Sequence, residues 1–270
     1  MKSCFRVFLM ILAAFLSPLE LYALDKVEVW DLYREGESAF RQANEQIQRD
    51  PAKARRLFEK AALAFETISR EGGIENGLLF YNIGNIYFRL GDMGRAILNY
   101  RKAERFIPND TNLQGNLNYA RSQCVDRIEP KPQAEILRTL FFWHYDLGGF
   151  TRAWLLAALS SLLWVSAGIY LLTRRSWLRH AAFSIAAIGI LLAGSLAVEA
   201  YEQANVHTGV VLEQEIIGRK GDSITFEPTF KEPLHAGVEF KLVEERKGWL
   251  HIELADGRRC WIPESAAELI

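Results

Sequence analysis

The chain has 270 residues, half of them hydrophobic, and its 32 Lys and Arg side chains nearly balance 33 Asp and Glu side chains. A net charge of −1 argues against a nucleic-acid partner, because neutralising phosphates requires an excess of cations. Three cysteines are too few for a disulfide-stapled secreted fold. The length allows about two domains. The average hydropathy of the chain is misleading, because its apolar residues are concentrated in three blocks.

The first apolar block lies in residues 1–23 and has the pattern of a secretory signal peptide. Two basic residues precede an apolar run from Val7 to Leu16, and small residues follow near Ala23. This order is typical of an export signal that is removed after secretion. Leu21 fits the cleavage pattern poorly, so an uncleaved anchor is the alternative.

Two further apolar segments, residues 153–172 and 181–198, are uncharged and long enough to cross a membrane as helices. The loop between them, residues 173–180, contains three arginines and no acid, which keeps short loops in the cytoplasm. The sequence therefore predicts a transmembrane hairpin with both flanking regions outside, and a buried soluble hairpin is the alternative. Small residues every four positions predict close packing of the two helices. These residues are Ala153, Ala157 and Ser161 in the first segment and Gly189, Ala193 and Ala197 in the second.

Residues 24–128 show apolar residues at spacings of three and four, which predicts helices. The clearest unit is residues 77–110. Its characteristic positions are Phe80, Ile83, Gly84, Tyr87, Ala96, Tyr100, Ala103 and Pro108. This spacing matches the tetratricopeptide-repeat (TPR) pattern, with Phe in place of the first Trp and Ile in place of Leu.

One such repeat cannot bury its own apolar face, so neighbouring helices are expected. Before the clear repeat, we expect a helix from about Trp30 to Gln48 and a second helix opened by Asp50 and Pro51. After it, the Asn-Asp-Thr sequence at 109–111 predicts the start of a closing helix. Residues 24–128 thus form a predicted TPR-like helical domain of about two repeats and a cap.

The concave face of a TPR-like array typically binds an extended peptide. Five side chains on the first helix of the clear repeat are not needed to pack its two helices together: Tyr81, Asn82, Asn85, Phe88 and Arg89. Amide and guanidinium groups can hold a peptide backbone or a carboxylate. These five residues are our candidate partner-binding site. The alternative is that they are ordinary polar positions or pack on the next helix.

Residues 129–152 are predicted to link the helical domain to the membrane. This segment includes an aromatic stretch, residues 136–150, that either lies along the outer membrane boundary or packs as a soluble helix on the preceding domain. Beyond Glu199, short alternating runs separated by Gly-containing turns predict β-strands. The predicted strands are residues 208–212, 223–226, 239–243, 249–254 and 259–262.

Five short strands within residues 206–270 fit a small all-β barrel. The Gly-Trp pair at 248–249, the Asp-Gly turn at 256–257 and the Cys-Trp-Ile-Pro sequence at 260–263 resemble a bacterial SH3 domain. Trp249 is a candidate ligand surface, whereas Trp261 is assigned to the core. The Tyr-rich first strand of peptide-binding SH3 domains is absent, which argues against polyproline binding.

The sequence contains no motif that indicates catalysis, so we expect a protein that is not an enzyme, without cofactor or metal. Its five histidines are scattered, and it has neither a Cys-x-x-Cys pair, nor a phosphate-binding loop, nor a nucleophile elbow. Cys124 and Cys260 either pair across domains or remain buried free thiols.

The order of signal peptide, helical repeat, two spans and SH3-like barrel, with the Tyr-Asn-Ile-Gly-Asn sequence at 81–85, resembles the BatE family of bacterial aerotolerance-operon proteins. This resemblance implies a non-enzymatic inner-membrane protein that works with other Bat-type proteins, some with von Willebrand A-type domains. The irregular first repeat around Arg49 to Arg56 departs from the family pattern.

We therefore expect a scaffold in a stress-related or aerotolerance-related complex of the cell envelope. Its TPR array binds a partner protein, and both soluble domains lie on the periplasmic side of the inner membrane. The alternative is a cell-wall receptor whose SH3-like domain binds peptidoglycan peptides.

Overall fold

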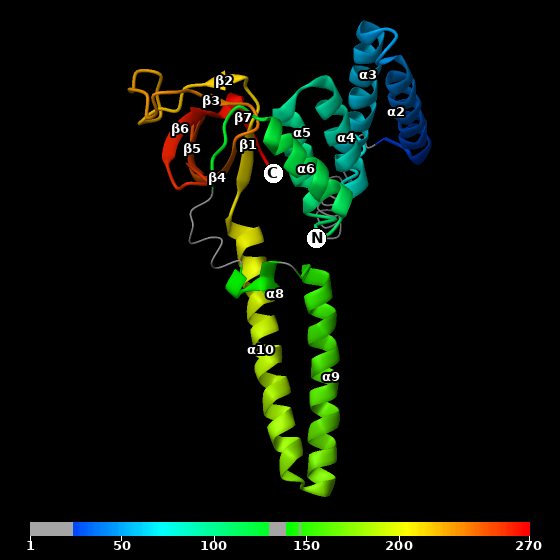
Figure 1. Ribbon diagram of the computed structural model, residues 1–270, viewed down its shortest axis with the longest axis vertical. Coiled ribbons are helices and arrows are strands. Elements are labelled where there is room, and N and C mark those ends of the chain that lie inside the picture. Colours follow the sequence, from blue (N-terminus) through cyan, green and yellow to red (C-terminus); the bar gives the residue numbers. More distant parts are fainter. Residues whose placement is uncertain (1–23, 130–138, 146) are drawn as a thin grey trace, which may run out of the picture. The chain divides into compact units, whose positions relative to one another are not determined.

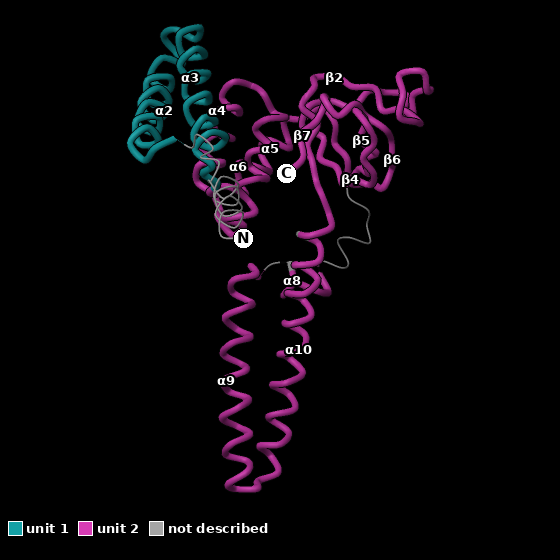
Figure 2. Tube along the Cα trace, turned by 180° about the vertical axis from the view of Figure 1, so that it is seen from behind, with its two compact units in different colours: residues 1–75 teal, residues 76–270 magenta. Residues whose placement is uncertain are grey.

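The computed structural model describes residues 24–129, 139–145 and 147–270 (Figure 1). The predicted signal peptide, residues 1–23, and residues 130–138 of the predicted linker lie outside the described residues. The described part is mostly helical, with a small antiparallel sheet region after residue 206. The chain divides into two compact units, residues 1–75 and residues 76–270 (Figure 2).

The described part of the first unit is a pair of helices, α2 (Lys26–Gln46) and α3 (Pro51–Arg70). α2 begins with a capping box, in which the Asp25 carboxylate accepts a hydrogen bond from the backbone N–H of Glu28. α3 begins at a proline, where the missing N–H costs nothing, and Asp50 caps it. The helix expected to begin at Asp50 and Pro51 is confirmed, and its predecessor begins four residues before the predicted start.

In the second unit, α4 (Gly77–Leu90) and α5 (Met93–Glu104) form a close pair. Gly91 has a φ of +80°, which favours glycine, and turns the chain between them. Gly84 permits the close approach, since a Cβ added there would lie 2.5 Å from Cδ1 of the Tyr100 ring.

The expected closing helix is α6 (Thr111–Gln123), which packs against α5. The Asp110 carboxylate caps it by accepting a hydrogen bond from the backbone N–H of Leu113 at 2.8 Å. Leu113 and Leu117 are fully buried. The start of each of these helices therefore follows a local signal that is readable in the sequence, namely an Asp or Asn cap before the helix.

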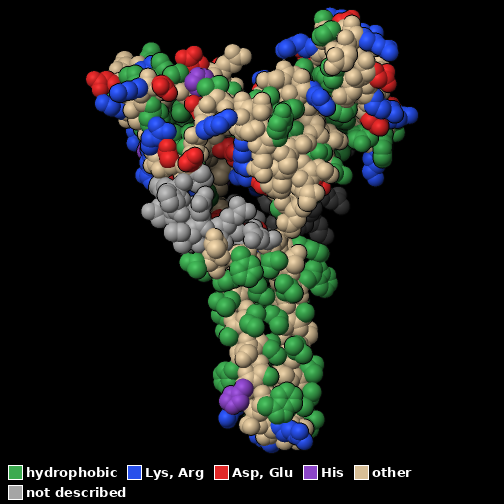
Figure 3. All heavy atoms as spheres, viewed as in Figure 1, with side chains coloured by type: hydrophobic (Ala, Val, Ile, Leu, Met, Phe, Trp, Pro, Cys, Tyr) green, Lys and Arg blue, Asp and Glu red, His purple; other side chains and the backbone are tan. Residues whose placement is uncertain are grey.

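Two long helices follow the short helix α8 (Phe142–Tyr145): α9 (Gly149–Thr173) and α10 (Ser176–Asn205). Both are long and apolar enough to cross a membrane, and 6% of the most apolar stretch of each is buried. Hydrophobic side chains cover the pair, and Lys and Arg side chains gather at the end where the helices join (Figure 3). The connection is shorter than the predicted loop, because both helices continue past their apolar segments until only Arg174 and Arg175 remain between them.

The prediction that small-residue stripes bring α9 and α10 together is wrong for five of its six residues. Ala153, Ala157 and Ser161 are exposed, and so are Ala193 and Ala197. Only Gly189 is half-buried, and a Cβ added there would lie 3.7 Å from Cδ1 of Leu156 in α9. The residues buried along the pair include Leu192 and three polar side chains that can bond locally or across the helices, namely Arg152, Ser166 and Ser195. Periodicity places small residues on a common face, but here larger and polar side chains fill the contact.

The C-terminal region is antiparallel, with a five-stranded sheet in the order β6-β5-β4-β1-β7 and a separate two-stranded ladder, β2-β3. The elements are β1 (Thr208–Val211), β2 (Glu215–Ile216), β3 (Leu234–His235), β4 (Glu239–Arg246), β5 (Trp249–Leu254), β6 (Arg259–Pro263), the 3₁₀ turn η1 (Glu264–Ala266) and β7 (Ala267–Leu269). Alternate residues of β5 are buried, which gives the sheet a core that includes Leu250, Ile252 and Ile262.

Four of the five predicted strands coincide with β1, β4, β5 and β6, but the strand predicted at residues 223–226 is wrong. The backbone N–H of Phe226 donates to the Ser223 carbonyl at 3.2 Å, and the Ser223 hydroxyl accepts a hydrogen bond from the backbone N–H of Thr225. A serine that bonds its own neighbouring backbone favours a turn over a sheet ladder. The strands that the sequence did not predict, β2, β3 and β7, have only two or three residues each.

We expect Gly84→Ala to destabilise the protein by about 1–3 kcal/mol, because the new methyl group overlaps the Tyr100 ring. The matched control is Gly115→Ala in α6, where an added Cβ meets nothing within 4 Å. That substitution should stabilise the helix by about 0.5–1 kcal/mol through backbone entropy. Urea unfolding followed by circular dichroism at 222 nm measures both. A loss of stability in the control, or none in Gly84→Ala, contradicts the packing described here.

Candidate functional site

The second unit contains a junction at which the helices α5 and α6 contact the sheet. The first turn of α5 approaches β1 at Gly94, where an added Cβ would lie 2.9 Å from the Val211 carbonyl oxygen. A glycine is therefore what allows the helix and the strand to touch. In the sequence, α5 and α6 precede the long helices α9 and α10, and the strands follow them. The junction therefore joins two parts of the chain that are separated by both long helices.

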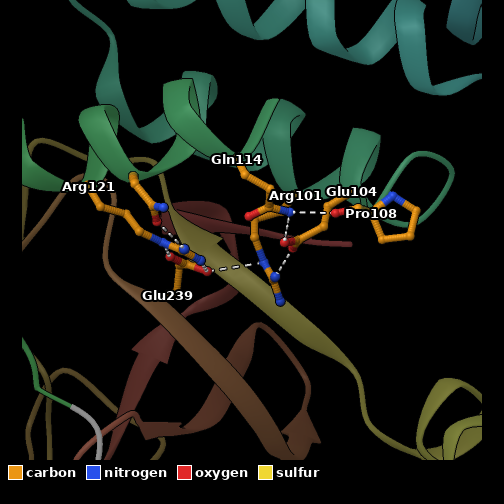
Figure 4. A network of polar contacts seen from close by, with 7 residues as sticks. Arg101, Glu104, Pro108, Gln114, Arg121 and Glu239 are labelled. Atoms are coloured by element: carbon orange, nitrogen blue, oxygen red, sulfur yellow. Dashed lines mark hydrogen bonds and ion pairs between the residues drawn. The ribbon is translucent and has the colours of Figure 1, made fainter. Parts of the chain in front are cut away.

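Glu239, the first residue of β4, is the centre of this junction (Figure 4). Its carboxylate accepts two hydrogen bonds from Arg121 of α6, from Nε at 2.6 Å and from Nη2 at 2.9 Å. The second cation is Arg101 of α5, whose Nε lies 3.1 Å from the same carboxylate. A bidentate arginine on a shared carboxylate is one of the stronger and more directional contacts in proteins.

The polar network continues into the helices. Arg101 also forms an ion pair with Glu104, and Gln114 of α6 donates hydrogen bonds to Glu104 and to the Pro108 carbonyl. Burial lowers the pKa of Arg121, but its hydrogen bond and its attraction to Glu239 outweigh that effect and raise the pKa overall. The guanidinium therefore stays charged at every physiological pH.

Two further polar contacts flank the centre. Lys102 of α5 forms an ion pair with Glu268 of β7 at 2.6 Å. On the other side, the Asp126 carboxylate accepts a hydrogen bond from the backbone N–H of His235 at 2.7 Å and lies 3.2 Å from the Nδ1 atom of that side chain. The contact between helices and sheet thus involves side chains from α5, α6, β3, β4 and β7.

Cys124 lies at the junction, directly after α6. Its Sγ faces Gly237, which has a φ of +95° and no room for a side chain, since an added Cβ would be 2.5 Å from the sulfur. Cys124 and Cys260 are both free thiols in the structure. Burial raises the pKa of Cys124 to about 11, with help from the Glu239 and Asp126 carboxylates, and burial raises that of Cys260 to about 12.

An open cleft of about 680 Å³ lies beside the junction. Its lining includes Arg121, Cys124, Asp126, Ile128 and Glu239. Most of the charged groups in this lining are already bonded to each other or to His235. The arrangement therefore provides a firm contact between helices and sheet rather than a set of free polar groups.

The predicted partner-binding residues lie on α4, and three of them contact neighbouring helices. The Asn85 side-chain oxygen accepts hydrogen bonds from the Tyr100 hydroxyl at 2.8 Å and from Asn116 Nδ2 at 2.9 Å. Asn116 also donates to the Tyr81 hydroxyl at 3.0 Å. Phe88 packs against Tyr119 of α6, with 5.6 Å between the ring centroids. Tyr81, Asn85 and Phe88 therefore help to hold α4, α5 and α6 together.

Of the other two candidates, only Arg89 is more accessible than Tyr81, Asn85 and Phe88. Arg89 is exposed near the end of α4, and Asn82 is half-buried about two helical turns earlier, on the same side of the helix. A ligand on this face would meet the exposed Arg89 first. Whether the five residues bind a partner stays a prediction.

Of the two tryptophans weighed in the sheet region, Trp261 is 6% exposed, as expected for a core residue. His251 stacks on its ring at 4.7 Å, and the Arg246 guanidinium lies 4.7 Å from the ring centroid. Burial, together with the charge of Arg259, lowers the pKa of His251, so this imidazole is neutral at pH 7. Trp249 is half-buried on β5, and its role as a ligand surface stays a prediction.

Within residues 24–129, 139–145 and 147–270, no group of three or more His, Cys, Asp or Glu side chains is placed to hold a metal ion. The chain matches no protein-family model, and no curated protein sequence is similar enough to be matched. Function must therefore be inferred from the geometry of the chain itself.

We expect Cys124 to react slowly with iodoacetamide, because at pH 8 a thiol of pKa about 11 holds about 100-fold less thiolate than a cysteine with the ordinary pKa of 9.0. The rate should rise about tenfold per pH unit up to pH 11. Since folding favours the neutral thiol, its contribution to stability is present below about pH 9 and is lost as the pH rises through 11.

Residue-resolved mass spectrometry measures this reaction, with the same peptide in denaturant as the unperturbed reference. Cys260, whose pKa is about 12, is the internal control and should react more slowly still. Equal rates for Cys124 in the folded and the denatured protein would contradict the packed junction.

Proposed function

We propose that this protein is a membrane-anchored, non-enzymatic scaffold of the bacterial cell envelope. In this proposal α9 and α10 cross the membrane, and the helical and sheet regions act together on one side of it. The observation that carries the proposal is the contact of Arg121 with Glu239. One residue precedes both spans and the other follows both, so their contact requires an even number of crossings between them.

The charges at the joined end of α9 and α10 support an orientation. Arg174 and Arg175 form the connection, Arg179 follows within the first turns of α10, and residues 153–198 contain no acid. Short basic connections stay in the cytoplasm. Together with the export signal expected at residues 1–23, these charges support our proposal that the junction and both soluble regions lie on the periplasmic side of the inner membrane.

The helical region is proposed to be a short TPR array that binds a partner protein. Support comes from the paired helices α4 and α5, from their close crossing at Gly84 and from α6 as a closing helix. The resemblance to the BatE family makes a Bat-type membrane protein, including those with von Willebrand A-type domains, the proposed partner. Arg89 is exposed and is therefore the candidate residue that such a partner reaches first, and Asn82 lies on the same side of α4.

The sheet region is proposed to be an SH3-like domain with a supporting role. Antiparallel β1 and β4 to β7, with a 3₁₀ turn before the last strand, are compatible with that assignment. The acidic groups of the junction are occupied by arginine, lysine or backbone donors, which fits structural work better than acid–base chemistry. The proposed role of the sheet is therefore to hold the helical region in place above the membrane.

Photo-crosslinking in living bacteria tests the proposal. A photoreactive amino acid that replaces Arg89 or Asn82 in the full-length protein should yield a discrete adduct with another envelope protein. The matched control is the same replacement of Arg55, an exposed residue of α3. Arg55 should give no discrete adduct, because it lies outside α4.

Two results would contradict the scaffold proposal. One is the same set of adducts from Arg89, Asn82 and Arg55, which would indicate nonspecific contact. The other is no protein adduct from α4, together with cell-wall material captured by a fourth variant that carries the photoreactive amino acid at Trp249. That result would favour a peptidoglycan receptor instead.

A further inference from the structure

A buried arginine lies where the pair α9 and α10 meets the short helix α8. The Arg152 side chain is 3% exposed, although it precedes a long apolar segment. Its Nη2 atom forms an ion pair with Glu199 of α10 at 2.5 Å, and its Nη1 atom donates to the Ser195 hydroxyl. Gly149 leaves room for the carboxylate, since an added Cβ there would lie 2.8 Å from Glu199 Oε2.

His144 of α8 joins this cluster. Its Nδ1 atom lies 2.8 Å from the Ser195 hydroxyl and 3.1 Å from Arg152 Nη1. We call Arg152, Glu199, Ser195 and His144 the outer clasp. It connects α8, α9 and α10 through polar groups. A buried cation is costly unless it is paired and hydrogen-bonded, so Arg152 holds these partners close to it.

The outer clasp fixes the level of α8 along the helix pair. Arg152 directly precedes the apolar segment 153–172, and Ser195 lies three residues inside the end of the segment 181–198. At 1.5 Å per residue, Ser195 is therefore about 4–5 Å inside the apolar stretch. α8 is held at the boundary between apolar and polar parts of the helix pair.

The segment around α8, residues 139–145, contains no Lys, Arg, Asp or Glu and presents large apolar side chains outward. Phe142 is 57% exposed, and Leu140 and Phe141 are exposed beside it. The rings of Phe141 and Phe142 each meet Trp143 edge-on, with centroids 5.4 and 5.5 Å apart. This aromatic cluster has a polar attachment on one side and a hydrophobic surface on the other.

The same level of α9 carries a second exposed aromatic pair. Phe150 is 79% exposed, and its ring centroid lies 6.0 Å from that of Trp154. Aromatic rings concentrated at the end of an apolar helix are typical of the membrane–water interface. Each cluster is close in sequence to a member of the outer clasp, the first to His144 and the second to Arg152.

We infer that residues 139–145 lie in the phospholipid headgroup–acyl boundary, on the side of the membrane that holds the soluble regions. The ligand of this surface is the lipid bilayer itself, and the outer clasp keeps the segment at that depth. The contacts favour this placement over packing on the helical domain, because His144 bonds to α9 and α10. The inference rests on the proposed membrane hairpin.

Electron paramagnetic resonance of the full-length protein in phospholipid bilayers tests the inference. The three native cysteines are replaced, and a nitroxide is attached at Phe142→Cys, at Leu162→Cys within α9 or at Ile224→Cys, an exposed position of the sheet region. At Phe142 we expect collisions with a water-soluble nickel chelate to fall about fivefold below those at Ile224, because an interfacial segment is buried about 5–10 Å into the headgroup boundary.

The three labels separate the two proposals. A label at Phe142 as chelate-accessible as one at Ile224, with Leu162 shielded in lipid, overturns the interfacial placement and leaves the hairpin standing. Chelate access at Leu162 overturns the hairpin. Shielding at both Phe142 and Leu162 supports both proposals.

A second variant tests the outer clasp. Ser195→Ala removes the hydroxyl that His144 and Arg152 share, and it should raise the chelate accessibility at Phe142 about twofold while leaving Leu162 unchanged. The matched control is Ser166→Ala, whose hydroxyl bonds within α9, to the Leu163 carbonyl. No change in Ser195→Ala, or an equal change in both variants, overturns the role of the outer clasp.

Discussion

The ion pairs of the Glu239 carboxylate with Arg121 and Arg101 are the interactions on which the arrangement of the second unit depends. Arg121 reaches it from 118 residues earlier in the chain, and Arg101 joins from the neighbouring helix. Gly94 and Gly237 remove the side chains that would keep the helices and the sheet apart. Because the two long apolar helices lie between these partners in sequence, the same contact constrains how the chain would cross a membrane in the proposed hairpin. An ion pair between distant parts of the sequence thus bears on the proposed membrane topology.

Much of the fold was predictable, because its signals are local. The Asp-Pro start of α3, the Gly-Asp turn between α4 and α5 and the alternation along β5 depend on neighbouring residues alone. The strand predicted at residues 223–226 failed because a serine side chain competes with the sheet for backbone hydrogen bonds. The junction was not predictable, since Glu239 and Arg121 have no sequence feature that distinguishes them from other surface charges.

At the candidate site, too, the sequence indicates on which face of a helix a residue lies but not which residues contact it. Helical periodicity identified Asn85 as a residue outside the α4–α5 contact, but only the tertiary structure shows that Tyr100 and Asn116 bond to it. The small residues of α9 gave the opposite error, because Ala153 and Ala157 share a face that α10 does not cover. Arg152 was overlooked because a single arginine beside an apolar segment resembles an ordinary flanking charge. Its partner, Glu199, lies in the next helix.

A double-mutant cycle of Arg121→Gln and Glu239→Gln tests the central claim most directly, with urea unfolding of the full-length protein in detergent as the measurement. The half-buried, bidentate pair should give a coupling free energy of about 1 kcal/mol after allowance for solvent screening. The exposed pair Lys220 and Glu227 is the control and should show a weaker coupling, because solvent screens both charges. A coupling at Arg121 and Glu239 no larger than that of the control would contradict a packed junction between the helices and the sheet.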